Sequence, residues 1–183
     1  MITVVPESFV KVDYDVEVLL NAVQRSWERV MGTARELELQ IQVDEHAATT
    51  RFSVTSLEPL VVDVDGGAIE NHRDPRTLGE HEVELTFTCL FLEVYDRRLA
   101  VFGAPSLDVK LSQQHRTAWD VNLFGRVARR GLKLHKPRYL YNFRNRHGFT
   151  DHADSVFEQL WDVGDTTWRR IANFSDSALQ PPI

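Results

Sequence analysis

Residues 37–64 read LELQIQVDEHAATTRFSVTSLEPLVVDV, and this stretch decides the fold class. From Leu37 to Val43 apolar and polar residues alternate, which is the pattern of a strand with one buried and one solvated face. The alternation resumes in residues 50–54 after a polar turn, and residues 60–64 form a third run rich in valine. Three short strands joined by short turns predict an antiparallel meander.

Two long helices are predicted on either side of these strands. Residues 15–34 place apolar side chains at the helical period, with charged residues on the opposite face. Residues 80–98 follow a capping-box pattern that begins at Thr77, and they are apolar over most of the helix circumference, which predicts a buried central helix. We expect these two helices to bury the following residues together: Leu20, Val23, Trp27, Phe87, Leu90, Phe91 and Val94.

The second half of the chain continues with predicted helices and one more strand. Residues 111–130 have helical periodicity, with Ser112 as the cap. Residues 138–144 alternate three aromatic rings with other side chains, and this predicts a fourth strand. Two short helices are predicted to start near residues 150 and 165.

The fold class that follows is α+β. We expect an antiparallel sheet of three to four strands covered on one side by helices, with the long N-terminal amphipathic helix and the buried central helix among them. Residues 1–174 are predicted to form a single domain. Residues 175–183 are polar and end in prolines, so we expect a frayed C-terminal tail.

Composition excludes several classes of protein. Residues 1–10 lack the layout of a secretory signal, and no run of about 18 apolar residues exists, so no membrane span is expected. Cys89 is the only cysteine, which rules out an intrachain disulfide and a multi-cysteine zinc site. A reducing, cytoplasmic location is therefore expected, and the oligomeric state stays open.

Charge is distributed unevenly along the chain. The formal net charge is -6, yet residues 121–150 contain no Asp or Glu and eight basic residues, while the rest of the chain has 13 basic against 27 acidic residues. Local fields of this kind recruit anionic partners more than net charge does. The eight basic residues are Arg126, Arg129, Arg130, Lys133, Lys136, Arg138, Arg144 and Arg146.

The basic stretch 126–147 is the strongest functional signal, because cations interleaved with aromatic rings suit phosphates and bases respectively. We therefore expect a non-enzymatic binding module for an anionic, phosphate-bearing ligand or a single-stranded nucleic acid. A strand over residues 138–144 would also allow the rings to pack in the core and the arginines to be solvated or to pair with acidic residues elsewhere in the chain. The predicted ligand-binding residues are Lys133, Lys136, Arg138, Arg144, Arg146, Tyr139 and Tyr141.

Two other classes of function stay open. A degenerate or former metal-dependent hydrolase would place its site near Glu70, His72, His81 and Glu82, since His81-Glu82 matches half of the zinc-protease motif H-E-x-x-H. Leu85 occupies the position of the second histidine, and acidic residues in a first helical turn also suit the helix dipole. We therefore expect no metal and no cofactor, and we assign no catalytic residue. The third class is a protein-interaction or oligomerisation domain, for which Trp119, Trp168 and the tail are available.

Overall fold

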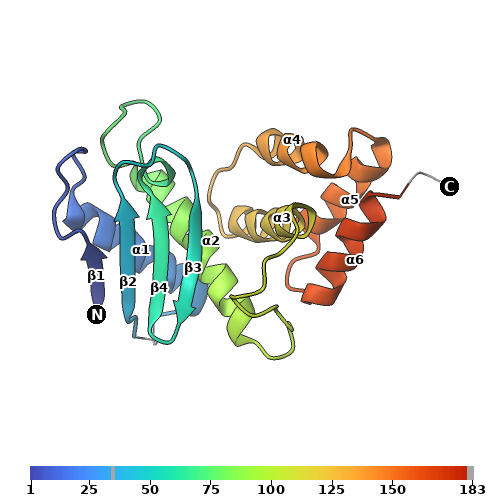
Figure 1. The fold of residues 1–183 in the computed structure, drawn as a ribbon, viewed down its shortest axis with the longest axis horizontal. Coiled ribbons are helices and arrows are strands. Elements are labelled where there is room, and N and C mark those ends of the chain that lie inside the picture. The colour runs from blue at the N-terminus through green and yellow to red at the C-terminus, as the bar shows by residue number, and fades with distance from the viewer. Residues whose placement is uncertain (34–35, 181–183) are drawn as a thin grey trace. The chain divides into compact units, whose positions relative to one another are not determined.

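The computed structural model describes residues 1–33 and 36–180 (Figure 1). These residues divide into two compact units, Met1–Tyr95 (unit 1) and Asp96–Ile183 (unit 2). Unit 1 holds a sheet and its helices, whereas unit 2 is helical. The span that the sequence predicted to be one domain thus contains two compact units.

Unit 1 is built on a four-stranded mixed sheet with the strand order β1-β2-β4-β3. Strands β1 and β2, and strands β2 and β4, pair in parallel, while β3 and β4 pair antiparallel. The last helix of the unit, α2, continues to Arg98 and so crosses the boundary into unit 2. The elements are β1 (Ile2–Val5), α1 (Val16–Met31), β2 (Leu39–Asp44), β3 (Phe52–Leu57), β4 (Leu60–Asp65), the 3₁₀ turn η1 (Gly66–Ala68) and α2 (Glu80–Arg98).

The α+β class is confirmed, but the predicted antiparallel sheet is wrong. Two facts account for the error. Strand β1 was not predicted, because it spans only four residues before Pro6; it pairs with β2 across the α1 crossover. Successive strands were also expected to be neighbours, whereas β4 lies between β2 and β3.

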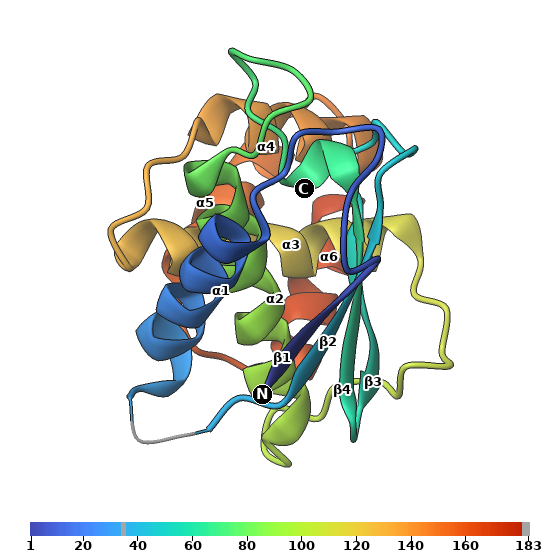
Figure 2. The ribbon, with the colours of Figure 1, turned by 90° about the vertical axis from the view of Figure 1, so that its left-hand side faces the viewer.

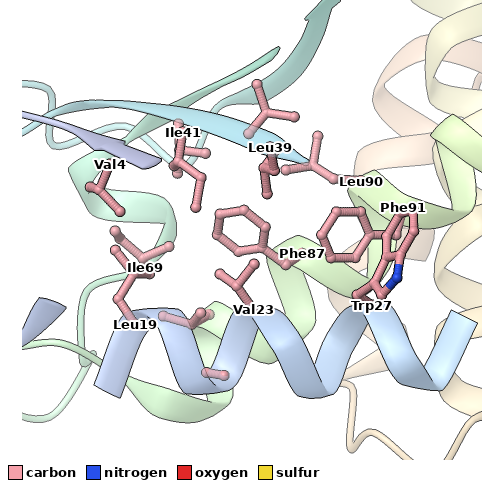
Figure 3. Close-up of a cluster of buried hydrophobic side chains, with 14 of the residues drawn as sticks. Val4, Leu19, Val23, Trp27, Leu39, Ile41, Ile69, Phe87, Leu90 and Phe91 are labelled. Atoms are coloured by element: carbon pink, nitrogen blue, oxygen red, sulfur yellow. The ribbon is translucent and has the colours of Figure 1, made fainter. Parts of the chain in front are cut away.

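The two helices cover one face of the sheet, as Figure 2 shows. Alternate residues of β2, β4 and β3 point into this layer, which is why Ile41, Val62 and Val54 are buried while Gln42 and Asp63 are exposed. The predicted core is confirmed for six of its seven residues, and Leu20 is partly buried against it. In Figure 3 Trp27 of α1 meets Phe91 of α2 edge to face, with ring centroids 5.1 Å apart.

Both predicted helices exist with small changes at their ends. Helix α1 is capped by Asp15, whose side chain accepts hydrogen bonds from the amides of Glu17 and Val18. Ala34, the last residue of the predicted helix, lies outside the described residues. Helix α2 begins at Glu80, and the Thr77 hydroxyl donates to the carbonyl of Asp74, so the predicted capping box does not form.

Unit 2 contains helices α3 (Gln113–Arg129), α4 (Lys136–His147), α5 (Asp151–Asp162) and α6 (Trp168–Ala178). Helix α3 packs against each of the other three, and Figure 1 shows the four gathered side by side. Gly125 lets α3 approach α5 closely, because a Cβ there would lie 2.1 Å from the carbonyl oxygen of Trp161 in α5.

The fourth strand predicted over residues 138–144 is wrong, since this segment lies within α4. Tyr139, Phe143 and His147 are spaced four residues apart, so their side chains share one face of a helix. Tyr139 and Phe143 would also share one face of a strand, so their spacing fits both structures. Pro137 stands at the start of the helix, where its missing N–H is not needed. Tyr139 and Phe143 of the aromatic alternation therefore belong to one packed helical stripe, whereas Tyr141 lies on the exposed side of the helix.

The predicted frayed tail is partly helical. Ser175 and Ala178 are buried in the last turns of α6, whose hydroxyl cap is Thr167. The described chain ends at Gln180, and residues 181–183 of the predicted tail lie outside the described residues.

Leu90 tests the core of unit 1, because its side chain has no solvent exposure. Leu90→Ala is expected to lower the free energy of unfolding by about 2 to 5 kcal/mol, through lost burial and the cavity left behind. Chemical denaturation measures this value, and Val10→Ala at a largely exposed position serves as the control. An unchanged denaturation midpoint for Leu90→Ala would contradict this packing.

Candidate functional site

Opposite charges gather in the two units. Unit 1 contains 7 Lys and Arg against 18 Asp and Glu, a formal charge of -11, whereas unit 2 contains 14 against 9, a formal charge of +5. The basic stretch therefore belongs to a unit that is basic as a whole. An anionic ligand is attracted to unit 2 and repelled by unit 1.

Helix α4 is held in place by the stripe that it buries. Phe143 is fully buried, stacks on His147 with ring centroids 3.9 Å apart, and lies 5.8 Å from the ring of Phe157 in α5. Tyr139, one turn earlier, packs on Phe124 of α3 at 4.2 Å. These contacts fix the rotation of α4 about its own axis, and they place the predicted ligand-binding residue Tyr139 in the packing of unit 2.

His147 anchors the C-terminal end of α4 to α6. Its Nδ1 lies 3.2 Å from the carbonyl oxygen of Phe143, which can only accept, so Nδ1 carries the proton and Nε2 accepts from the Ser175 hydroxyl at 2.9 Å. A serine, a histidine and an orienting acceptor are also the parts of a nucleophilic site. Here Ser175 has no solvent exposure, so no substrate reaches its oxygen and the bond is structural.

Two of the predicted ligand-binding cations, Lys136 and Arg144, pair with carboxylates of α5. The Lys136 ammonium lies 2.5 Å from a carboxylate oxygen of Glu158 and 5.2 Å from the ring centroid of Trp161. Arg144 makes a two-pronged pair with Asp154, in which Nε donates to Oδ1 at 2.7 Å and Nη2 donates to Oδ2. This pairing lowers the pKa of the Asp154 carboxyl and raises the pKa of the Arg144 guanidinium.

The side chains of three further basic residues form ion pairs or hydrogen bonds within unit 2. Arg126 is buried and pairs with Asp96, whose two carboxylate oxygens each lie 2.8 Å from Nη1, and with Asp165 at 3.0 Å from Nε. Arg129 donates to the carbonyl oxygen of Trp161, and Arg130 donates to that of Arg126. These side chains hold helices together.

The outward face of α4 keeps its remaining polar and charged side chains in solvent. Its exposed residues follow the helical period opposite Phe143 and His147, and α4 contains no acid. No hydrogen bond or ion pair joins the side chain of Arg138 or Arg146 to another residue within residues 1–33 and 36–180. We call this surface the α4 face; its residues are Arg138, Tyr141, Asn142, Asn145 and Arg146.

The structure thus divides the predicted site. Arg138, Arg146 and Tyr141 lie on the α4 face, while Lys133 is exposed in the loop before α4. Lys136, Arg144 and Tyr139 lie elsewhere on the helix. Asn142 and Asn145 were missed, although a helical period applied to residues 136–147 would have placed both beside Arg138.

The alternative site in unit 1 does not assemble a metal centre. Within residues 1–33 and 36–180 no three His, Cys, Asp or Glu side chains gather as metal ligands. Glu70 accepts the amide of Arg76 at 2.5 Å and so closes its own loop, and His72 and His81 are exposed. Glu84 of α2 pairs with Arg25 and Arg29 of α1.

An open recess of about 870 Å³ lies beside the first strand of unit 1. Asn21 and Gln24 of α1, together with Glu36, are among its lining residues. Among the described residues that line it, Glu36 is the one carboxylate and no histidine occurs.

Comparison of the chain with known protein families, with curated proteins and with solved structures finds no match. Every helix within residues 1–33 and 36–180 is too short or too polar to span a lipid bilayer. The function is therefore inferred from the side chains of this chain. The α4 face combines two arginines, two amides and an exposed tyrosine on one surface.

His147 gives unit 2 a pH dependence of defined sign. Burial lowers its pKa below the usual 6.5, nearby His115 acts in the same direction, and the Phe143 carbonyl and Asp176 oppose the shift. As the pH falls below about 6.5, His147 becomes protonated in the unfolded chain but stays neutral in the folded chain. The free energy of unfolding therefore decreases by up to about 1.4 kcal/mol per pH unit.

His147→Gln is the variant that isolates this effect, because glutamine stays neutral and can still bond to Ser175. We expect the free energy of unfolding of the native protein to fall more steeply than that of the variant between about pH 7 and pH 5. Urea denaturation at a series of pH values measures both curves. Parallel curves would show that His147 is not held neutral.

Proposed function

We propose that unit 2 is a binding module for a phosphate-bearing ligand and that the α4 face is its contact surface. The single observation that carries the proposal is the pairing state of the α4 cations. Lys136 and Arg144 are neutralised by α5, whereas Arg138 and Arg146 project into solvent from a helix without acids. Exposed guanidinium groups in a basic unit bind phosphate through charge-assisted hydrogen bonds.

The spacing of the two arginines suits an extended ligand. Arg138 and Arg146 are eight residues apart, which corresponds to about 12 Å along a helix axis. An extended chain of phosphates matches that spacing without requiring the two side chains to converge. The proposal therefore favours a polyanion over a small phosphate metabolite.

The remaining features of the chain are compatible with an intracellular binding module. Cys89 is a free, buried thiol, and a reducing cytoplasmic location, with no role for a membrane, stays part of the proposal. No catalytic role is included, because the buried Ser175–His147 pair has no access to substrate.

Charge reversal on the α4 face tests the proposal. Arg138→Glu combined with Arg146→Glu is expected to abolish binding of inorganic polyphosphate at low salt and to remove roughly 1.4 from the log–log salt slope for a single-stranded oligonucleotide. Stability should change by no more than about 1 kcal/mol, because both side chains are exposed. Isothermal titration calorimetry measures the binding.

The matched control is Arg169→Glu combined with Arg170→Glu, two exposed arginines of α6 in the same unit. This variant has the same net charge as the α4 variant, so it should keep most of the binding. Equal losses in both variants would assign binding to net charge alone. Absence of polyphosphate and oligonucleotide binding by the native protein would refute the proposal.

A further inference from the structure

Two aromatic rings stand exposed at the α4 face. Tyr141 is 58% exposed and Phe149 is 63% exposed, and within residues 1–33 and 36–180 no other Phe, Tyr or Trp side chain is as exposed. They also touch each other, with ring centroids 6.0 Å apart and planes at 72°. Leaving two adjacent rings in water forgoes hydrophobic stabilisation, and such patches mark binding surfaces.

Arginines of α4 lie on the same exposed side of the helix as Tyr141. Arg138 precedes Tyr141 by three residues, so the two side chains are neighbours on the helix surface, and Arg146 belongs to the same exposed face. The guanidinium of Arg144 lies 6.0 Å from the ring centroid of Phe149 while it pairs with Asp154. Exposed rings and unpaired arginines therefore coincide on one surface.

We propose that the α4 face binds single-stranded nucleic acid, with bases stacking on Tyr141 and Phe149 while Arg138 and Arg146 contact phosphates. This inference rests on the proposed function and adds the class of ligand. Aromatic faces accept any base, so recognition is expected to tolerate sequence differences. The amides of Asn142 and Asn145 lie on the same face, where they can bond to base edges.

Duplex DNA and an anionic membrane fit this surface less well. Bases within a duplex are stacked on one another, so the rings of Tyr141 and Phe149 cannot reach their faces. A helix that lies in a membrane surface needs a continuous apolar stripe. The apolar stripe of α4 contains Phe143 and is buried within unit 2, and the α4 face carries two amides instead.

An abasic strand separates base stacking from phosphate binding. We would measure fluorescence anisotropy of labelled oligothymidine of about 12 nucleotides and of an abasic strand of the same length and charge. The native protein should bind oligothymidine about 5- to 150-fold more tightly, which corresponds to one stacked base at about 1 to 3 kcal/mol. This comparison does not depend on any variant.

Ring removal gives the second arm. Tyr141→Ala combined with Phe149→Ala should lower the affinity for oligothymidine to that for the abasic strand and leave the abasic affinity unchanged. Tyr141→Phe keeps the ring and should keep the affinity.

The outcomes distinguish the two proposals. Equal affinity for both strands, abolished by Arg138→Glu combined with Arg146→Glu, would overturn base stacking and leave the phosphate-binding function intact. No binding to either strand or to polyphosphate would refute the proposed function itself. Tighter binding to phosphatidylserine vesicles than to oligothymidine would overturn the inference in favour of a lipid surface.

Discussion

Burial of one stripe of α4 is the constraint on which the proposed binding surface depends. Phe143 and His147 are held by α5 and by α6, and a helix that buries this side must expose the opposite one. The hydrogen bond from Ser175 to His147 fixes the end of the helix where Arg146 stands. The position of the α4 face therefore follows from packing contacts that involve no ligand.

The cations of the basic stretch fall into a paired and an unpaired group, according to their contacts with the neighbouring helices. Acidic residues of α5 neutralise Lys136 and Arg144, and Asp96 with Asp165 compensates the buried Arg126. A buried guanidinium is tolerated only with such partners. What is left over, Arg138 and Arg146, is available to a ligand because no carboxylate of the described chain pairs with either residue.

The sequence identified the helices and the core far better than the sheet. The periods of residues 15–34 and 80–98 are long, so they specified α1, α2 and their shared core correctly. Strand neighbours depend on contacts distant in sequence, and nothing local shows that β4 lies between β2 and β3. Residues 138–144 were too short to separate a strand period from a helical one. This error hid Asn142 and Asn145, while Arg138, Tyr141 and Arg146 were already among the predicted ligand-binding residues.

Backbone amide chemical shifts, followed by NMR during titration with a single-stranded oligonucleotide, test the central claim most directly. The account predicts that the largest changes fall on residues 138–149 and weaken as salt is added, with little change in the acidic unit 1. Changes concentrated in unit 1 or on α6, or no changes at all at low salt, would contradict it.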